Sequence, residues 1–463
     1  MKQKKSFNIN PFVLIFCVVI ICGLFTFIIT PGTLVDGVYT ALPRNQLTFN
    51  NVFNFFRAIP MGLKDTSNLV ILILTIGAAL EIYKRTGAID AGIDVLVRKF
   101  GQQSRSFLLI VMIVVFSAMG GFLGWIEVLI PFMPLVVAMV LALGYDTLTA
   151  VAIVTIGSMA GFMAGPTNLY TVAVCNGILQ TMGILPEGSD VFVGLNFRLV
   201  LWVVITGIST IYIMTYAGKV HKDPSKSLVA DVDVSDLANA EGEEVKFTAS
   251  HALVLLSILA AMIMTVIGMK YGFDGVKWSI DDVSAIFLAS AIFSGFVGKM
   301  KPAGIADAFI AGARGAVGGA LIVGFARAVY WIMNAANINA TIVYHATQLL
   351  KGMPPFAAAI GIVILVSLIN GLIPSGSGKG ALLSPIIIPI AMELGLTSQT
   401  SVLAYQFGDG ITNMFWFSYG TLLIFLSYGK VSLQKWWKFF VPLMAIFFVV
   451  AFAALGIAIA TGF

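Results

Sequence analysis

Residues 370–379 read NGLIPSGSGK, a glycine- and serine-rich interruption between two apolar segments. The apolar segment PIIIPIAMELGLTSQTSV follows at residues 385–402, and a second interruption, GITN, lies at residues 410–413. Inside a membrane, interruptions of this kind are tolerated where the backbone is buried in protein or lines a cavity. This stretch therefore predicts a binding site within an intramembrane fold.

The same order of segments occurs earlier in the chain. GGFLGWIE lies at residues 120–127, PLVVAMVLALGYDTLTAV at 134–151 and GPTN at 165–168, and the long segments of the two halves share the spacing of their Pro, Gly and Val residues. The stretch around Gly62 likewise parallels the one around Gly312. A duplicated apolar chain with interruptions at matching places is typical of secondary transporters, and the interruptions indicate the binding site.

Composition places the chain in a membrane. Of its 463 residues, 59% are hydrophobic and 11% are charged, whereas soluble proteins carry about 25% charged residues. At least eight stretches approach the ~20 residues that a spanning helix needs. We therefore expect a multi-pass protein of a bacterial-type inner (plasma) membrane, which contacts the lipid bilayer and binds no nucleic acid.

Lys and Arg residues beside the apolar stretches indicate the topology. Lys2, Lys4 and Lys5 predict a cytoplasmic N-terminus. Following the basic residues along the chain gives nine spanning helices and two hairpins, with the C-terminus outside. Corresponding elements of the two halves receive opposite orientations, which predicts an inverted-topology repeat.

The predicted fold is an all-α polytopic membrane protein in three parts. Residues 1–217 form a first inverted repeat and residues 248–463 a second, while the polar, acid-rich residues 218–247 form a cytoplasmic linker. The first repeat holds scaffold helices, a re-entrant hairpin at about 106–143 and a broken helix at 147–182. The second repeat holds a hairpin at about 356–394 and a broken helix at 400–428. We expect the helix breaks at residues 161–168 and 408–413.

The two hairpin tips and the two helix breaks should meet near mid-membrane. Hydroxyl, amide and carboxylate oxygens suit an alkali cation, and ionisable residues at membrane depth are costly enough to indicate function. The candidate ion-binding residues are Thr167, Asn168, Asp409, Thr412 and Asn413. The candidate substrate-binding residues are Glu127, Asn168, Ser375, Gly376, Ser377, Gly378, Lys379, Asp409 and Asn413.

The basic residues allow two interpretations. Lys379 either meets a substrate carboxylate or forms a structural pair with Glu127 or Asp409, and Arg314 and Arg327 could also reach the site. The three Cys and three His residues are scattered, so they indicate neither a disulfide framework nor a metal site. No catalytic set is evident, so we expect no enzyme and no cofactor, with Na⁺ or H⁺ as the coupling ion.

At these residues the chain resembles the four-carbon dicarboxylate anaerobic carrier family, in its YfcC-like branch, which includes basic amino-acid antiporters of the arginine/ornithine type. The resemblance is carried by IPMGLKDTSNLVILIL, GWIEVLIPFMP, GPTN, NGLIPSGSGKGALLSPIIIPIA and FGDGITNMFW, and it covers nearly the whole chain outside residues 218–247. That family is similar to the ion transporter superfamily. The resemblance implies a scaffold domain, a transport domain with two hairpins, an elevator movement and a homodimer.

Two positions depart from the family's pattern. Relatives often carry paired acids after the first tip, whereas here Glu127 is followed by Val128. Many relatives have Gln where this chain has Lys379. Losing an acid and gaining a base favours a substrate with at least one carboxylate. We therefore expect a secondary carrier of small organic acids or amino acids that is coupled to an ion or exchanges one solute for another. A basic amino-acid antiporter is the main alternative, and an intramembrane enzyme or a channel is a remote one.

Overall fold

The computed structural model describes residues 11–35, 38–92, 95, 105–186, 189–235, 237 and 247–463. Within these ranges, eight helices have the length and apolar composition needed to cross a membrane. Lys2, Lys4 and Lys5, which predict the cytoplasmic N-terminus, lie outside the described residues, as do residues 236 and 238–246 of the expected linker.

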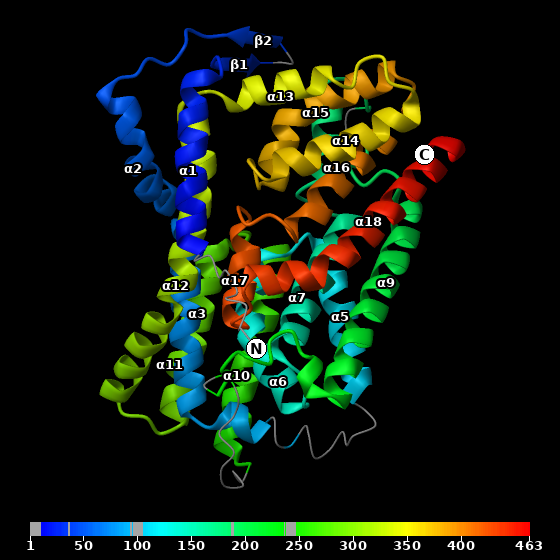
Figure 1. The fold of residues 1–463 in the computed structure, drawn as a ribbon. Helices are drawn as coiled ribbons and strands as arrows, with labels where there is room; N and C mark the ends of the chain where they lie inside the picture. Colours follow the sequence, from blue (N-terminus) through cyan, green and yellow to red (C-terminus); the bar gives the residue numbers. More distant parts are fainter. Residues whose placement is uncertain are drawn as a thin grey trace, which may run out of the picture.

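The helices pack into two groups that lie side by side (Figure 1). We call the first the α12 group, because its helices gather around the 34-residue helix α12. Helix α3 packs along α12 and makes the most extensive contact between two helices in the structure. Its members are α1 (Pro11–Ile28), α2 (Phe49–Asp65), α3 (Ser67–Arg85), α10 (Ala249–Lys270), α11 (Ile280–Val297) and α12 (Pro302–Ala335).

The second group surrounds α7, and we call it the α7 group. Every residue of α7 is buried, because α7 packs against α5, α9 and α16 at once. Its members are α5 (Arg105–Leu123), the 3-10 helix η2 (Glu127–Phe132), α6 (Met133–Ala142), α7 (Thr147–Ala164), α8 (Val172–Thr181), α9 (Leu195–Lys222), α14 (Pro355–Asn370), α15 (Gly376–Glu393), α16 (Ser398–Asn413), α17 (Gly420–Tyr428) and α18 (Leu433–Thr461).

A small sheet was not expected from the sequence. Strands β1 (Gly32–Val35) and β2 (Val38–Ala41) pair as an antiparallel hairpin between α1 and α2. Helix α13 (Asn339–Gln348) packs against both strands and also contacts α14 and α15. The sheet and α13 thus connect the two groups at one end of the molecule (Figure 1).

The first hairpin differs from expectation at its tip. Gly120 and Gly121 were expected to interrupt the helix, but α5 continues through them to Leu123. A Cβ on Gly120 would collide with the carbonyl oxygen of Ser158, and one on Gly161 with that of Ser117. These glycines therefore let α5 and α7 approach closely, which is the usual role of small residues between membrane helices.

The helix breaks also lie further along the chain than expected. Helix α7 ends at Ala164, and Gly165 follows with a φ of 42°, a left-handed conformation that favours glycine. Residues 165–171 then form the first break. Residues 408–413 are helical, and the second break lies at residues 414–419. Gly408 and Gly410 lie within α16, where a Cβ would collide with residues of α14 and α7, so these glycines permit close packing and do not break the helix.

The described part of the expected linker is ordered against the α7 group. Helix α9 continues to Lys222, and the short 3-10 helix η3 (Pro224–Lys226) follows it. Ser227 donates a hydrogen bond of 2.6 Å to the carboxylate of Asp146, and Lys435 forms an ion pair with Asp231. The beginning of the linker is therefore held on the surface of this group.

Candidate functional site

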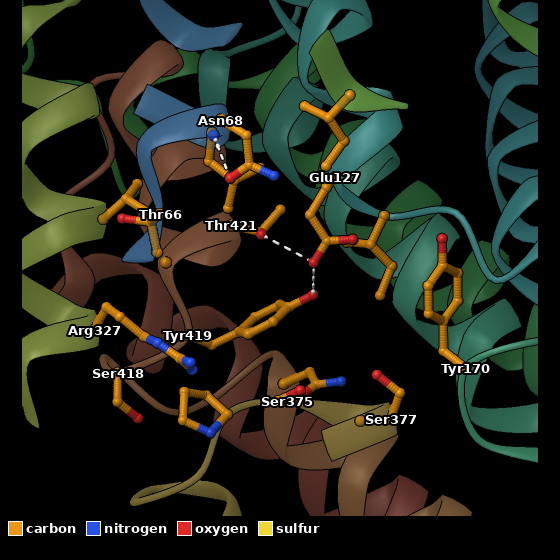
Figure 2. Close-up of a pocket in the computed structure, with 18 of the residues that line it drawn as sticks. Thr66, Asn68, Glu127, Tyr170, Arg327, Ser375, Ser377, Ser418, Tyr419 and Thr421 are labelled. Carbon is orange, nitrogen blue, oxygen red and sulfur yellow. Dashed lines mark hydrogen bonds between the residues drawn. The ribbon is translucent and has the colours of Figure 1, made fainter. Parts of the chain in front are cut away.

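A cavity of about 450 Å³ lies where the two groups meet. The α12 group contributes the junction of α2 with α3 and part of α12, while the α7 group contributes both hairpin tips and the second break (Figure 2). Its volume lies in the range of about 300–1,000 Å³ that is typical of small-molecule sites. The lining residues include Asp65, Thr66, Asn68, Glu127, Tyr170, Arg327, Ser375, Ser377, Asn413, Ser418, Tyr419 and Thr421.

One wall of the cavity carries a carboxylate. Glu127 is the first residue of η2 at the first hairpin tip, and it is half-buried. Its Oε1 accepts hydrogen bonds from the Tyr419 hydroxyl at 3.0 Å and the Thr421 hydroxyl at 3.4 Å. Both donors stand at the start of α17. The first tip and the second break thus hold this carboxylate together, facing the cavity (Figure 2).

The opposite wall carries a guanidinium. Arg327 of α12 lies 3.6 Å from the carboxylate of Asp65, which is the last residue of α2. Its guanidinium also sits over the ring of Tyr330, 4.2 Å from the centroid. The 3.6 Å ion pair is longer than a hydrogen bond, and the Nε of Arg327 has no hydrogen-bond partner. The buried Nε is therefore not fully paired in this conformation, while Arg327 itself lines the cavity.

Three helices begin at the cavity. The first turns of α3, α15 and α17 contribute Asn68, Ser377 and Thr421 to its lining. The N-cap residues of α3 and α17 make no side-chain hydrogen bond, although Asn68 accepts from the amide of Leu69 at 2.9 Å in the first turn of α3. A helix N-terminus carries a partial positive charge and unpaired amide groups. The cavity therefore offers anion-binding groups next to a carboxylate and a guanidinium.

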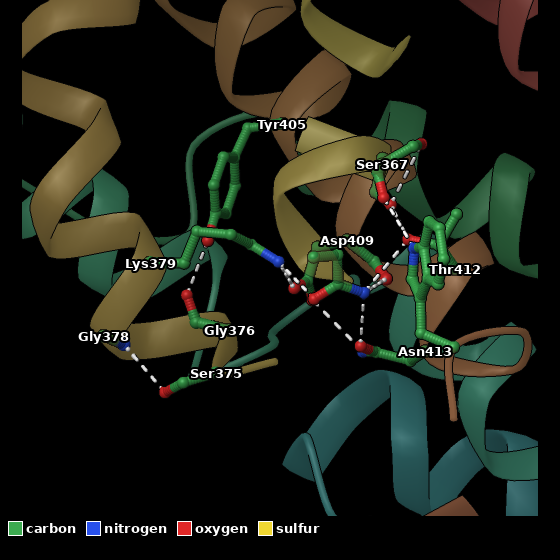
Figure 3. A network of polar contacts seen from close by, with 12 residues as sticks. Ser367, Ser375, Gly376, Gly378, Lys379, Tyr405, Asp409, Thr412 and Asn413 are labelled. Atoms are coloured by element: carbon green, nitrogen blue, oxygen red, sulfur yellow. Dashed lines mark hydrogen bonds and ion pairs between the residues drawn. The ribbon is translucent and has the colours of Figure 1, made fainter. Parts of the chain in front are cut away.

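Lys379 lies behind the cavity wall rather than on it. Its ammonium is 2.7 Å from Oδ1 of Asp409, and both side chains are fully buried, at 0% exposure. It also donates a hydrogen bond to Oδ1 of Asn370. Of the two interpretations of Lys379, the structure shows the pair with Asp409 (Figure 3). In this conformation the ammonium does not face the cavity.

Asn370 connects the second tip to the second broken helix. Its Nδ2 group donates to the backbone carbonyl of Asp409, the hydroxyl of Thr412 and the side-chain oxygen of Asn413, at 2.9–3.2 Å. The amide of Asn413 in turn donates to Oδ2 of Asp409 at 3.3 Å. Asp409 therefore has Lys379 on one oxygen and Asn413 on the other.

The polar residues of the first break serve the local backbone. Asn168 accepts from the amides of Tyr170 and Thr171 and donates to the carbonyl of Phe162. The hydroxyl of Thr167 donates to the carbonyl of Phe122 at 2.7 Å, which ties the break to the first hairpin. These two side chains shape the break and do not line the cavity.

The structure thus divides the residues that the sequence singled out. It brings Glu127, Ser375, Gly376, Ser377 and Asn413 together around the cavity. Gly378 is absent from the lining, and its amide donates to the hydroxyl of Ser375 at the start of α15. The residues that lie behind the lining are Thr167, Asn168, Lys379, Asp409 and Thr412.

Sequence reasoning missed several lining residues. Asp65 and Asn68 belong to the quoted motif IPMGLKDTSNLVILIL, but nothing in that motif places them opposite the hairpin tips. Tyr419 lies in none of the motifs singled out from the sequence, and its partner Glu127 lies 292 positions away. Arg327 was only a secondary candidate, and Arg314 on the same helix is exposed and outside the lining.

Residues 9–460 match the family described as "DcuC: C4-dicarboxylate anaerobic carrier". The chain belongs to this family. It is a multi-pass inner-membrane transporter and not an enzyme. The expectations of an α-helical polytopic membrane protein and of this family are confirmed.

Individual relatives carry different substrate names. The chain is 29% identical to "Putative basic amino acid antiporter YfcC" of Escherichia coli (strain K12), over 86% of this chain and 79% of that protein. It is 24% identical to "Putative short-chain fatty acid transporter" of the same organism, over 59% and 61%. Among solved structures, it matches the MtrF efflux pump of Neisseria gonorrhoeae with a TM-score of 0.45 and 16% identity, over 97% and 95%.

Proposed function

We propose that this carrier is a secondary active transporter that binds an amino acid in the cavity between the α12 and α7 groups. The observation that carries the proposal is the placement of a carboxylate and a guanidinium on opposite walls. Glu127 belongs to the α7 group and Arg327 to the α12 group. An amino acid would place its amine toward Glu127 and its carboxylate toward Arg327 and the helix N-termini.

The charge of the cavity favours a cationic amino acid. Among the described residues, the charged side chains in the lining are Asp65, Glu127 and Arg327. Two carboxylates and one guanidinium leave a formal charge of −1. A basic amino acid carries +1 and balances this charge, whereas a dicarboxylate at −2 would be repelled. With Lys379 paired to Asp409, Lys379 no longer serves as the group that meets a substrate carboxylate, and Arg327 takes that role in the proposal.

A small organic acid is the second candidate, and a specific observation favours it. Three helices begin at the cavity beside Arg327, and half-helix N-termini suit anionic groups. The family's description as C4-dicarboxylate carriers points the same way. The two candidates differ in whether Glu127 meets a substrate amine.

For the transport cycle we propose an elevator movement within an inverted-topology repeat. The α7 group, with both hairpins and both broken helices, would carry the solute past the α12 group. The position of the cavity between the groups supports this division. The same proposal includes coupling to Na⁺ or H⁺, or an exchange of solutes. It also includes the boundaries of the two repeats and the linker, a homodimer and the cytoplasmic N-terminus.

The proposal is tested by uptake into proteoliposomes. The panel contains arginine, ornithine, aspartate, succinate and butyrate, each with and without an inward Na⁺ gradient and with and without internal arginine. We expect saturable uptake of a basic amino acid. Arg327→Gln should lower that uptake by about tenfold or more, because a charge-assisted hydrogen bond contributes about 1.5–3 kcal/mol. The matched control, Arg314→Gln, changes an exposed arginine of the same helix.

Other results would contradict the proposal in distinct ways. Uptake of succinate or butyrate without any amino acid would establish the organic-acid alternative. Equal losses in Arg327→Gln and Arg314→Gln would remove Arg327 from the binding site. Flux that never accumulates solute against its gradient would indicate a channel.

A further inference from the structure

The strongest unused feature is the buried charge pair behind the cavity. Three polar side chains contact one another where the second tip packs on α16. They are Lys379, Asn370 and Asp409, and each has 0% exposure. The ammonium contacts the amide oxygen of Asn370 and a carboxylate oxygen of Asp409. These are hard oxygen ligands of the kind that hold an alkali cation. The ammonium therefore sits where the sequence predicted a bound cation.

The duplication shows that the fold does not need charge at these positions. Lys379 lies six residues before Pro385, and in the first half Val128 lies six residues before Pro134. The same spacing brings the first residues of α7 and α16, Thr147 and Ser398, into register, so Asp409 corresponds to Ser158. Val128 and Ser158 are both buried. One half thus carries a charged pair where the other carries two uncharged residues.

Stability does not explain the charged pair. Taking two charges out of water is costly, and replacing a buried ion pair by apolar residues is often neutral or stabilising. The first half has the uncharged residues Val128 and Ser158 at the corresponding buried positions. The two charges at the second tip therefore point to a function that the fold alone does not require.

We propose that Lys379 is a built-in cation: its ammonium permanently fills a cation site formed by Asn370 and Asp409, with Asn413 as a second contact of Asp409. The second tip then needs no external Na⁺ to neutralise Asp409. Any coupling ion of this transporter binds elsewhere or is a proton. Removing the ammonium while keeping its oxygen ligands should open the site to an external alkali cation.

The cavity provides a route to that site. Gly376 and Asn413 both line the cavity. A Cβ on Gly376 would lie 3.3 Å from Oδ2 of Asp409, and Asn413 donates to the same oxygen, so two lining residues adjoin this carboxylate. A small cation that enters the cavity can therefore reach Asp409 once the lysine side chain is shortened.

The test measures the thermal stability of the purified full-length protein in detergent, with NaCl exchanged for choline chloride at constant ionic strength. The wild-type melting temperature should show no cation effect that depends on the Lys379–Asp409 pair. Lys379→Ala should melt several degrees lower in choline, because Asp409 is left buried and unpaired. Added Na⁺, Li⁺ or K⁺ should restore much of this loss in a saturable way.

Two further variants serve as matched controls. Lys379→Met refills the space without a charge and should show no saturable cation effect. Lys379→Val combined with Asp409→Ser copies the uncharged residues of the first half, and it should be folded and respond to cations no differently from the wild-type protein. The melting temperature is measured without substrate, so this test is independent of the proposed transport of amino acids. Only the conclusion about the coupling ion rests on the proposed function.

A saturable stabilisation of the wild-type protein by Na⁺ that is unchanged in the double variant places the Na⁺ site elsewhere and supports the proposal. The same effect lost in the double variant overturns it. A folded Lys379→Ala variant that responds to no alkali cation also overturns it. If Lys379→Ala does not fold, Lys379→Ser, which also removes the ammonium and keeps the oxygen ligands of Asn370 and Asp409, is measured in its place.

Discussion

At the residue scale, Glu127 connects three parts of the transporter. It belongs to the first hairpin tip, its hydrogen-bond donors belong to the second break, and it faces the arginine-bearing wall across the cavity. A carboxylate with two hydroxyl donors on one oxygen keeps its other oxygen for a ligand. This geometry fits binding of a substrate amine.

Glu127→Gln should lower uptake of a basic amino acid by about tenfold or more, because a charge-assisted hydrogen bond of about 1.5–3 kcal/mol is lost. Proteoliposome uptake at several substrate concentrations measures the effect. The control, Glu81→Gln, removes an acid that pairs with Arg85 on the surface at 2.8 Å. Wild-type uptake by Glu127→Gln would show that no substrate amine meets this carboxylate.

Tyr419→Phe should have a smaller effect, about two- to tenfold on uptake, because a neutral hydrogen bond contributes about 0.5–1.5 kcal/mol. Tyr428→Phe is the matched control on the same helix: its hydroxyl is buried without a hydrogen-bond partner. Removing that hydroxyl should leave uptake unchanged and keep or raise the melting temperature. A larger loss in Tyr428→Phe than in Tyr419→Phe would refute the assigned role of Tyr419.

The sequence could indicate part of this site. Glu127, Ser375, Ser377 and Asn413 were found because they lie in or beside glycine-rich interruptions of apolar segments. Arg327 is a lining residue that was only a secondary candidate, because its role depends on how α12 faces the other group. The partner of Lys379 stayed open for the same reason, since burial of a side chain is decided by packing that no local pattern reports.

At the element scale, glycine has two roles that look alike in sequence. Gly124 lies at the first tip with a φ of 69°, whereas Gly120, four residues earlier, is an ordinary helical residue. Only the tertiary contact with Ser158 separates the two cases. This explains why the order of helices and interruptions could be predicted, while both breaks were expected several residues too early.

Gly120→Ala should therefore lower stability by about 1–3 kcal/mol, the usual cost of overpacking a core. Gly177→Ala is the matched control in helix α8, where a Cβ meets nothing within 4 Å. It should stabilise the protein by about 0.5–1 kcal/mol, because glycine is unfavourable inside a helix. Melting temperatures in detergent measure both changes. Equal stability of the two variants would contradict the close packing of α5 on α7.

At the scale of the whole molecule, the account depends on two helix groups that move relative to each other around one cavity. Composition and duplication were enough to predict a polytopic transporter, and the match to the family confirms it. The division into the α12 and α7 groups follows from contacts between helices far apart in the sequence. The inverted repeat and the elevator movement stay predictions.

A disulfide between the groups tests this movement most directly. A Cβ on Gly319 of α12 lies 3.9 Å from the Cβ of Ser427 of α17, within the range of about 3.5–4.5 Å found in disulfides. The pair Gly319→Cys and Ser427→Cys is introduced after Cys17, Cys22 and Cys175 are replaced by alanine. Ser257→Cys with Ser294→Cys is the control, since these hydroxyls lie 2.8 Å apart within the α12 group.

The decisive measurement is amino-acid uptake into proteoliposomes before oxidation, after oxidation and after reduction. The account predicts that oxidation of the Gly319→Cys, Ser427→Cys pair abolishes uptake, that reduction restores it, and that the control pair transports in all three states. Full uptake with the Gly319→Cys, Ser427→Cys disulfide formed would contradict a transport cycle in which the α7 group moves against the α12 group.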